Sequence, residues 1–291
     1  MSCYLHEVQS LPFPLKFELT KNRIKGWYKY WSGKVYVSFS GGKDSTVLLS
    51  IVRRLYPDVV AVFVDTGLEY PEVRKFVQTI DNVRWIKSKL SFVEVIEKWG
   101  YPVVSKEVAQ KIYEIRNTRS DKLRKSRLET SGPKGLPKKW MYLLDAPFKI
   151  SHHCCRIMKK SPCISFERHS NLVPFVGMMA ANSWLRYTRF LTKGCNVFGG
   201  KRPTSNPISF WTEDDIWEYV HQYNIEYSNI YDMGYNTTGC VFCGFGAHLE
   251  EAKFGMNRFQ LLNKTHPKLW KYCMDKLGMK EVLEYTGVSI N

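Results

Sequence analysis

The sequence predicts an α/β protein with a doubly wound, mostly parallel sheet and flanking helices. The first observation is a set of short β-branched or apolar runs, at residues 33–39, 59–64 and 83–86, which alternate with helical segments. The second is the unbroken apolar character of residues 59–64, which is typical of a strand buried on both faces. The third is a Gly-Gly turn after the first run, where the strand gives way to a helix.

The first expected elements follow from local patterns. Residues 18–31 predict an amphipathic helix, because Leu19, Ile24 and Trp27 are available to pack on one side of it. After the first strand, a helix is expected at 44–55, followed by the apolar strand, a helix at 71–80 and the third strand.

The second half of the chain is expected to be mostly helical. Residues 105–130 predict one long polar helix without a clean apolar stripe, followed by a loop at 131–137. A further strand is expected at 173–178, a helix at 214–223 and several helices over 250–286. Thr212 is the expected N-cap of the helix at 214–223, with Asp215 at its third helical position.

Residues 38–45 read Ser-Phe-Ser-Gly-Gly-Lys-Asp-Ser and form the expected phosphate-binding loop. Glycines let the backbone approach a ligand closely, and free N–H groups at a helix start attract anionic oxygens. Lys43 adds a positive charge, and Ser40 and Ser45 add hydroxyl donors. The spacing is not that of a Walker loop. The alternative is a glycine turn with a lysine there by chance, which the ordered set of residue types disfavours.

The chain carries a formal net charge of +16 over 291 residues. Such an excess suggests a polyanionic partner, most simply a nucleic acid, while solubility and the handling of phosphates are the alternative explanations. Part of the excess lies at residues 101–140, where eleven Lys or Arg stand against four Asp or Glu. Either a solvated charged surface or a nucleic-acid contact would produce this run.

The composition also bears on location. Hydrophobic residues make up 44% of the chain, enough for a packed core, but there is no run of 18 apolar residues and we expect no membrane span. Residues 1–7 lack a basic stretch followed by an apolar one, so no secretory signal is expected. We therefore expect a cytoplasmic protein.

Eight cysteines in such a chain indicate metal or redox chemistry more than disulfides. Cys154 and Cys155 are adjacent, and Cys240 and Cys243 form a C-x-x-C pair. Four thiolates can bind a tetrahedral zinc ion or a [4Fe–4S] cluster. Adjacent cysteines favour the cluster, because neighbouring sulfurs can bind different irons, whereas zinc ligands are normally a few residues apart.

Other interpretations of the cysteines stay open at this point. Buried free thiols are common, and Cys240 with Cys243 could instead act as a redox dithiol. The remaining cysteines have no matching partner spacing and are expected to be structural, with Cys163 and Cys195 in reserve as ligands or sulfur carriers. They are Cys3, Cys163, Cys195 and Cys273.

As an ordered set, these motifs resemble the phosphoadenosine phosphosulfate (PAPS) and adenosine phosphosulfate (APS) reductase family of the PP-loop ATP pyrophosphatases. The resemblance runs from about residue 33 to residue 245. Its pieces are Ser38 to Ser45, Val64 to Glu72, Cys154-Cys155, Asn206-Pro207-Ile208, Trp211 to Trp217, Tyr227, Gly234-Tyr235 and Gly239 to Cys243. Each piece is weak alone, but their order along the chain makes the set specific.

The resemblance implies an adenine nucleotide alpha hydrolase-like fold and a division of the chain into three parts. Residues 1–32 are expected to be an N-terminal helical leader. Residues 33–245 are expected to be the PP-loop nucleotide-binding domain, with the cluster cysteines and a basic insertion at about 101–140. Residues 246–291 are expected to be a C-terminal helical segment.

The resemblance also implies cofactors and residue roles. In the APS-using branch of the family, a Cys-Cys pair and a distant C-x-x-C pair together ligate a [4Fe–4S] cluster, which here would fall to Cys154, Cys155, Cys240 and Cys243. The nucleotide would be ATP, with Mg²⁺, or APS or PAPS. Phosphates would be held by Ser38, Ser40, Gly41, Gly42, Lys43, Asp44 and Ser45, with Asp65, Thr66 and Gly67 near the adenosine.

Several basic residues are implied in anion binding. One of Arg156, Lys159 and Lys160 would neutralise an anionic group next to the cluster. Arg186 and Arg189 are the expected anion binders of a later loop, with ordinary surface charge as the alternative. The candidate catalytic residues are Lys43, Asp44, Arg156, Lys159 and Arg186.

One departure from the family bears on the reaction. The reductases carry a catalytic cysteine in a Glu-Cys-Gly-[Leu/Ile]-His context near the C-terminus, where it accepts the sulfur. Residues 274–291 contain no cysteine, and Cys273 lacks the flanking Gly and His. The reductase nucleophile is therefore expected to be absent.

Three hypotheses follow. The first is an ATP-dependent sulfurtransferase that forms AMP and pyrophosphate, takes sulfur from the cluster, a cysteine persulfide or a donor protein, and modifies an acceptor such as tRNA or DNA. The second is an APS or PAPS reductase that releases sulfite, with Cys273 or an electron-donor protein supplying the thiol. The third is a nucleic-acid-binding module with structural zinc and a degenerate nucleotide site, which the intact loop disfavours.

Overall fold

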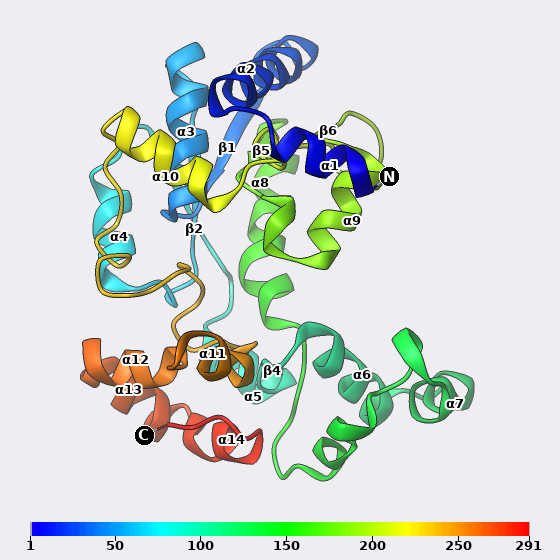
Figure 1. The fold of residues 1–291 in the computed structure, drawn as a ribbon. Helices are drawn as coiled ribbons and strands as arrows, with labels where there is room; N and C mark the ends of the chain where they lie inside the picture. Colours follow the sequence, from blue (N-terminus) through cyan, green and yellow to red (C-terminus); the bar gives the residue numbers. More distant parts are fainter. Residues whose placement is uncertain (1, 291) are drawn as a thin grey trace. The chain divides into compact units, whose positions relative to one another are not determined.

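A computed structural model describes residues 2–290, and the chain divides into two units, each with its own sheet (Figure 1). The first unit consists of Met1–Asp65, Tyr70–Ile86 and Cys163–Tyr231. The second consists of Thr66–Glu69, Lys87–Pro162 and Asp232–Asn291. Both units are therefore built from segments far apart in the sequence. The predicted boundaries near residues 33 and 245 stay a prediction.

The described part of the first unit has a six-stranded sheet in the order β3-β2-β1-β5-β7-β6. Its strands are β1 Val35–Phe39, β2 Ala61–Asp65, β3 Val83–Lys87, β5 Val173–Val176, β6 Asn196–Val197 and β7 Thr204–Ser205. β1 pairs in parallel with β2 and with β5, β5 pairs in parallel with β7, and the short β6 is antiparallel to β7. The predicted mostly parallel sheet is confirmed.

Helices cover both faces of this sheet. They are α1 Ser2–Gln9, α2 Phe13–Tyr30, α3 Lys43–Leu55, α4 Pro71–Gln78, α8 Ser161–Ser170, α9 Trp184–Lys193 and α10 Glu213–Gln222, with a 3₁₀ turn at Ala180–Asn182. On one face, Trp27 of α2 contacts Phe175 of β5. On the other, Tyr36 of β1 meets Phe166 of α8 edge to face. The doubly wound arrangement is therefore confirmed.

Helix α10 begins as the sequence predicts and is held against α2. The Thr212 side chain accepts a hydrogen bond from the Asp215 N–H, and the Asp215 carboxylate accepts one from the Thr212 N–H. These two reciprocal bonds form a capping box. Asp215 also forms a buried ion pair with Lys16 of α2. One turn along α2, Thr20 accepts the indole hydrogen bond of Trp211 at 2.9 Å. Buried charge and buried polar groups are thus paired where these helices meet.

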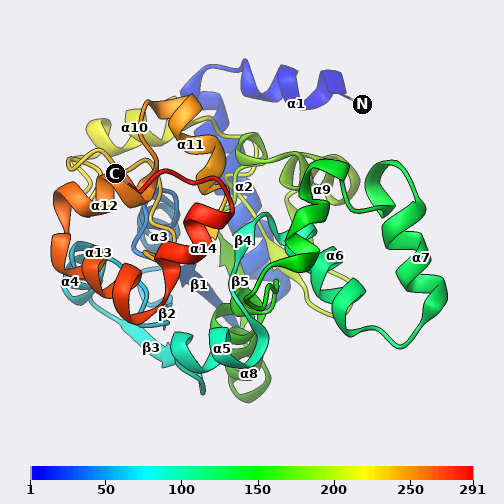
Figure 2. The same ribbon diagram turned by 90° about the horizontal axis from the view of Figure 1, so that it is seen from below.

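The second unit combines a two-stranded parallel sheet with many short helices. Its elements are α5 Phe92–Trp99, β4 Val103–Val104, α6 Lys106–Asn117, α7 Asp121–Glu129, 3₁₀ turns at Gly132–Lys134 and Lys138–Asp145, a π-helix at Arg156–Lys160, β8 Gly244–Phe245, α11 Ala247–Phe254, α12 Arg258–Thr265, α13 Pro267–Lys271, a π-helix at Tyr272–Lys276 and α14 Met279–Tyr285. Figure 2 shows α12, α13 and α14 following one another as neighbours. Ile112, Leu143 and Val282 belong to one buried apolar cluster of this unit.

The expectation of one long helix over 105–130 is wrong. α6 ends at Asn117, Thr118 is extended with φ −75° and ψ 142°, and α7 begins after Ser120. The Ser120 side chain accepts a hydrogen bond from the Leu123 N–H, which starts a new helix instead of continuing the old one. The predicted loop at 131–137 contains a short 3₁₀ turn, and the C-terminal segment is helical as expected.

Across residues 2–290, none of the helices has both the length and the apolar composition needed to cross a membrane.

Candidate functional site

The loop predicted to bind phosphate lies where the strand order of the first unit reverses. The chain leaves β1 for β2 on one side, while β5 and β7 continue the sheet on the other. In open α/β sheets the crevice at such a switch point, beyond the carboxyl ends of the strands, is the usual ligand site. Residues 40–42 connect the end of β1 to the start of α3 there. The first unit therefore has the architecture of a nucleotide-binding α/β protein.

Gly41 has a conformation and surroundings that only glycine tolerates. Its φ is +71°, in the left-handed region. A Cβ atom at this position would lie 2.7 Å from Cγ2 of Val77 and 2.8 Å from Cγ1 of Val73, both buried residues of α4. The glycine therefore brings the loop backbone tightly against α4.

The serines of the loop hydrogen-bond to one another across the turn. The two hydroxyl oxygens of Ser40 and Ser45 are 3.0 Å apart, and the Ser40 N–H donates to Ser45 Oγ at 3.1 Å. The Gly42 N–H donates to Ser40 Oγ at 3.3 Å, and Ser45 and Thr46 both donate to the Gly42 carbonyl. These bonds hold the loop in a fixed turn around the N-terminus of α3.

Lys43 is buried at the first position of α3 and has partners that sequence reasoning missed. Its ammonium group lies 3.2 Å from a Glu213 carboxylate oxygen and 5.0 Å from the centre of the Tyr231 ring. The Lys43 backbone N–H donates to the Tyr231 hydroxyl at 2.8 Å. Glu213 lies within the recognised Trp211–Trp217 motif, but the sequence carries no signal for Tyr231, which is 188 residues from Lys43.

Asp44 is the acidic group of the loop, and its surroundings favour the uncharged form. Burial raises the pKa of its carboxyl group, Lys43 opposes that shift, and Glu213 adds to it. Arg186 of α9 lies within electrostatic range of Asp44 and also lowers the pKa. Asp44 Oδ1 is buried without a hydrogen-bond partner in the described structure, although Lys43 lies 3.9 Å away. A buried, unsatisfied carboxylate oxygen is suited to binding a cation.

Other predicted residues lie close to the loop or apart from it. Ser38 is within β1. Asp65, at the end of β2, is buried and paired with Arg74 of α4 at 2.5 Å. Thr66 and Gly67 belong to the second unit, where Thr66 donates from its hydroxyl to the Glu69 carboxylate at 2.6 Å.

Helix α9 carries Arg186 beside a set of exposed aromatic and apolar side chains. Trp184 is 75% exposed and Leu185 is 82% exposed. The rings of Trp184 and Tyr187 are stacked, with centroids 5.2 Å apart and planes 23° from parallel. Within Trp184–Lys193, all of which the structure describes, only Phe190 is buried. Exposed aromatic rings interleaved with basic residues are typical of a surface that binds single-stranded nucleic acid.

The structure brings the four predicted cluster cysteines together in the second unit. Cys154, Cys155, Cys240 and Cys243 all lie within electrostatic range of one another, and Cys154 donates a thiol hydrogen bond to Cys155 at 3.9 Å. Cys154 and Cys155 form the first turn before the π-helix at Arg156–Lys160. π-helical turns occur often at functional sites.

Lys159 is the basic residue that contacts these thiols. Burial lowers the pKa of Lys159, but interactions with Cys240 and with the Glu69 carboxylate raise it further, and Lys159 hydrogen-bonds to Cys240. Arg156 and Lys160 are exposed instead. Of the three basic residues that sequence reasoning could not separate, the structure therefore places Lys159 against the cysteines.

Two further cations at the cysteines were not foreseen. The hydrogen bond from Cys154 lowers the pKa of Cys155, burial opposes this shift, and Lys106 and Lys159 add to it. Arg258 donates to the Cys243 carbonyl at 3.1 Å and is held in place by Glu250. Lys106 and Arg258 are distant from the cysteines in sequence, so no local pattern marked them.

Burial keeps two of the thiols protonated in the absence of a ligand. It raises the pKa of Cys243 to about 11, with Cys240 contributing, and raises that of Cys240 against the effect of Lys159.

Gly244 allows the C-x-x-C turn to reach β4, because a Cβ there would lie 2.7 Å from the Pro102 carbonyl oxygen. In the described part of the chain, no group of three or more His, Cys, Asp or Glu side chains is arranged to hold a single metal ion.

The donor set fits an anionic sulfur-ligated cofactor. Four thiols within electrostatic range of one another are the type of ligand that an iron–sulfur cluster requires, and Lys106, Lys159 and Arg258 supply positive charge near them. Of the other cysteines, Cys3 lies outside the described side chains. Cys163 and Cys195 are in the first unit, with Cys195 against the Ser209 hydroxyl at 3.1 Å.

Comparison with known families identifies the fold. The phosphoadenosine phosphosulfate reductase domain family matches residues 34–130 and 105–244, well over half of the chain. The chain belongs to this family.

Two relatives illustrate the range of similarity. An uncharacterised protein of Methanocaldococcus jannaschii is 25% identical over 253 residues, which are 85% of this chain and 42% of that protein. The chain thus spans less than half the length of that relative. The adenosine 5′-phosphosulfate reductase of Staphylococcus epidermidis is 26% identical over 222 residues, which are 76% of this chain and 74% of the reductase.

Solved structures resemble the chain more distantly. The PAPS reductase of Candida auris, in its phosphate complex, has a TM-score of 0.47 at 14% identity and covers 76% of this chain and 87% of its own. The U34-tRNA thiolase NcsA of Methanococcus maripaludis, with its [4Fe–4S] cluster, has a TM-score of 0.39 at 11% identity and covers 93% of this chain and 80% of its own.

Proposed function

We propose that this chain is an ATP-dependent sulfurtransferase that forms AMP and pyrophosphate, holds a [4Fe–4S] cluster on Cys154, Cys155, Cys240 and Cys243, and modifies a nucleic acid. The observation that carries the proposal is the convergence of those four thiols beside Lys159 in a family that acts on adenine nucleotides. When bound, the cluster would supply redox-active iron next to thiolate sulfur.

Cys273 separates this proposal from reductase chemistry. It is the last cysteine of the given sequence, it is completely buried within the π-helix at Tyr272–Lys276, and burial raises its pKa. A nucleophilic thiol needs access and thiolate character, and Cys273 has neither. The alternative in which Cys273 accepts sulfur from APS is therefore disfavoured.

The phosphate loop would perform the activation step. Lys43 would bind the triphosphate, and Asp44, with its unsatisfied oxygen, would help to hold Mg²⁺. An acceptor oxygen attacks the α-phosphorus, the bond to the β-phosphate oxygen breaks, and pyrophosphate leaves. Lys43 and Arg186 stabilise the negative charge that develops at the α-phosphate.

The second step replaces the activated oxygen by sulfur. A donor at the oxidation level of sulfide attacks the carbon of the adenylated acceptor, the carbon–oxygen bond breaks, and AMP leaves with the oxygen. No net oxidation is needed when the donor is at this level. One AMP is therefore released for each sulfur transferred to the acceptor, which a product assay can count.

Nucleic acid is the proposed acceptor because of charge and exposed aromatic side chains. The chain carries a net charge of +16, and α9 combines the exposed Trp184 and its stacked neighbour Tyr187 with Arg186 and Arg189. Arg186 lies within electrostatic range of Asp44 in the phosphate loop, so bases stacked on α9 would lie near the site of activation.

Anaerobic purification tests the cofactor. The expected result is a brown protein whose visible spectrum shows an iron–sulfur cluster, with about four iron and four sulfide per chain. Cys154→Ser and Cys243→Ser should lose the colour. Cys195→Ser is the matched control, because its Sγ already accepts or donates a hydrogen bond with Ser209 that a hydroxyl can replace. A colourless wild-type protein loaded with zinc would contradict the proposal.

Nucleotide turnover tests the reaction. We expect AMP and pyrophosphate from ATP only when RNA or DNA is present, and loss of both products in Lys43→Ala. The second candidate, an APS or PAPS reductase with a thiol from an electron-donor protein, is favoured by the 26% identity to the S. epidermidis enzyme. Sulfite release from APS or PAPS with a reduced dithiol protein, and no AMP from ATP with any nucleic acid, would establish that candidate instead.

A further inference from the structure

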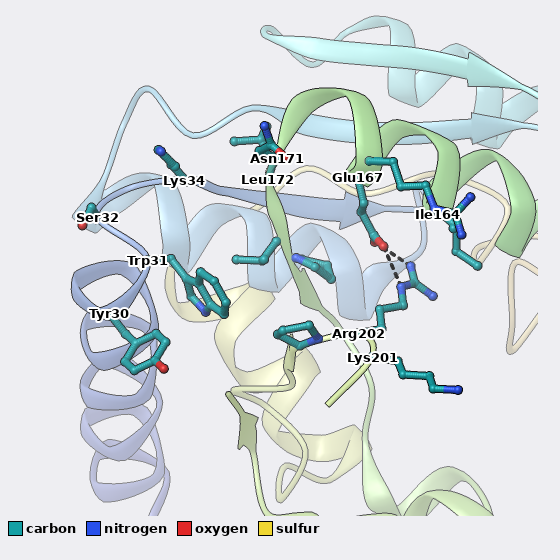
Figure 3. A pocket seen from close by; sticks show the side chains of 14 residues that line it. Tyr30, Trp31, Ser32, Lys34, Ile164, Glu167, Asn171, Leu172, Lys201 and Arg202 are labelled. Atoms are coloured by element: carbon teal, nitrogen blue, oxygen red, sulfur yellow. Dashed lines mark hydrogen bonds and ion pairs between the residues drawn. The ribbon is translucent and has the colours of Figure 1, made fainter. Parts of the chain in front are cut away.

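A second pocket lies in the first unit, away from the phosphate loop. Its volume is about 800 Å³, and its walls come from the end of α2, the start of β1, the end of α8, the start of β5 and the segment before β7 (Figure 3). The pocket residues Ser32 and Lys34 precede β1, whereas the phosphate loop follows it. Five strand residues at ~3.3 Å each put the two sites roughly 17 Å apart. The pocket is therefore not the proposed ATP site.

The charged side chains of this pocket leave an excess of positive charge. Its lining contains Lys34, Arg168, Lys201 and Arg202 against the single carboxylate of Glu167. Arg202 donates to both oxygens of Glu167, at 2.8 and 2.6 Å, and so neutralises it. Figure 3 shows this pair with Lys201 beside it. In the described structure, Lys34, Arg168 and Lys201 have no carboxylate partner, so three cationic groups remain for a ligand.

A buried hydrogen bond fixes the neutralised side of the pocket. Glu167 also accepts from the hydroxyl group of Tyr36, at 2.7 Å, and Tyr36 is completely buried in β1. Burial raises the pKa of Tyr36, and its hydrogen bond to Glu167 adds to that shift, so the phenol stays a donor. The Glu167–Arg202 pair is thus part of the folded framework and not a free charge that a ligand would displace.

The opposite side of the pocket is aromatic. Figure 3 shows Tyr30 and Trp31 on that side, across from the Glu167–Arg202 pair. Tyr30 is 61% exposed, and its ring centre lies 4.5 Å from that of the exposed Phe198 and 5.2 Å from that of Trp31. The indole nitrogen of Trp31 is buried and has no hydrogen-bond partner among the described residues. The wall therefore offers exposed aromatic surface for stacking.

We propose that this pocket binds a nucleotide unit of single-stranded nucleic acid, with its base against Tyr30 and its phosphates near Lys34 and Lys201. Stacking aromatics beside unpaired cations are what a sequence-tolerant single-strand site requires. An acidic peptide would match the charge but would leave the aromatic wall unused. The inference rests on the proposed function for the nature of the polyanion, and it adds a second anchor, one strand length from the site of activation.

Binding of a fluorescein-labelled, mixed-sequence single-stranded RNA of twelve nucleotides to the full chain, without ATP, tests the proposal by fluorescence anisotropy. Tyr30→Ala should weaken binding roughly five- to hundredfold, the range for loss of one base–aromatic stack. Lys34→Ala combined with Lys201→Ala should reduce the slope of log Kd against log salt by about 1.4, because each single-strand phosphate contact contributes ~0.7.

Lys25→Ala is the matched control, because Lys25 is exposed on α2 but does not line the pocket. It should leave the affinity and the salt slope unchanged, and circular dichroism should show all variants folded. Binding by the pocket variants that equals that of Lys25→Ala would overturn the proposal. An equal loss of affinity for polyglutamate, which has charge but no base, would also overturn it.

The two proposals can fail separately. RNA binding that depends on Tyr30 and Lys34, in a protein that makes no AMP with any nucleic acid, would support the pocket and contradict the sulfurtransferase. RNA-dependent AMP formation in a protein whose RNA affinity ignores the pocket variants would do the reverse.

Discussion

Replacing Gly41 by alanine tests whether the loop conformation seen here is required. The change forces an L-residue to φ +71° and places a methyl group 2.7 Å from Val77 and 2.8 Å from Val73. The left-handed backbone costs about 1–2 kcal/mol, and crowding into a packed site about 1–3 kcal/mol. Neither valine can move aside easily, because both are almost fully buried. The expected loss of folding stability is thus about 2–5 kcal/mol.

Equilibrium unfolding in urea, followed by tryptophan fluorescence, measures that loss. Gly255→Ala provides the comparison, because Gly255 is left-handed, with φ +73° and ψ −9°, but has nothing within 4 Å of an added Cβ. It should cost only the backbone contribution of about 1–2 kcal/mol. Equal destabilisation by the two variants would refute the steric argument. Gly41→Ala should also weaken ATP binding, because the altered turn no longer holds Lys43 at the start of α3 in the same place.

Three further predictions concern polar groups of the first unit. Burial raises the pKa of Asp44 in the folded protein, so its ionised carboxylate lowers the stability at neutral pH. This cost disappears in acid, where Asp44 is protonated in both the folded and the unfolded protein. Asp44→Asn should therefore stabilise the protein at pH 7 in urea titrations, with a gain that shrinks towards pH 4. Thr212→Ala removes the capping box with Asp215 and should cost about 1 kcal/mol in the same assay, while an unchanged midpoint would contradict it. Thr20→Val leaves the Trp211 indole N–H buried without an acceptor and should cost about 1–3 kcal/mol, more than Thr20→Ser does.

The parts of the structure that the sequence predicted are those determined by neighbouring residues. The phosphate loop lies on one continuous segment, where a β-branched strand, two glycines and a helix start follow in order. The capping box of α10 likewise needs only Thr212 and Asp215, three residues apart. Because strands of this kind pair in parallel and need helical crossovers, the sheet class followed from the same local signals.

Contacts between distant residues could not be predicted in the same way. Tyr231 reaches the backbone of Lys43 across 188 residues, and Lys106 and Arg258 approach cysteines on other segments. The residue types alone gave no preference among Arg156, Lys159 and Lys160, because the direction of each side chain depends on the π-helix that carries them. Such positions are decided by packing and not by local propensity.

The break between α6 and α7 shows where helix propensity misled the prediction. Lys, Arg, Glu and Leu dominate residues 105–130, and all are good helix formers. None of the residues 121–129, all of which the structure describes, is buried, so no packing holds α7 in line with α6. The Arg127–Glu114 ion pair joins α7 to α6, but no buried side chain of α7 does, so the hydrogen bonds of Thr118 and Ser120 are enough to end one helix and start another.

The single buried anchor of α9 has a consequence for motion. Phe190 is the one buried residue of this fully described helix, whereas most residues of α3 are buried. A helix attached through one aromatic ring opens at a small free-energy cost, well below that of unfolding the whole domain. We therefore expect α9 to open locally while the sheet stays rigid, which would move Arg186 away from the phosphate loop.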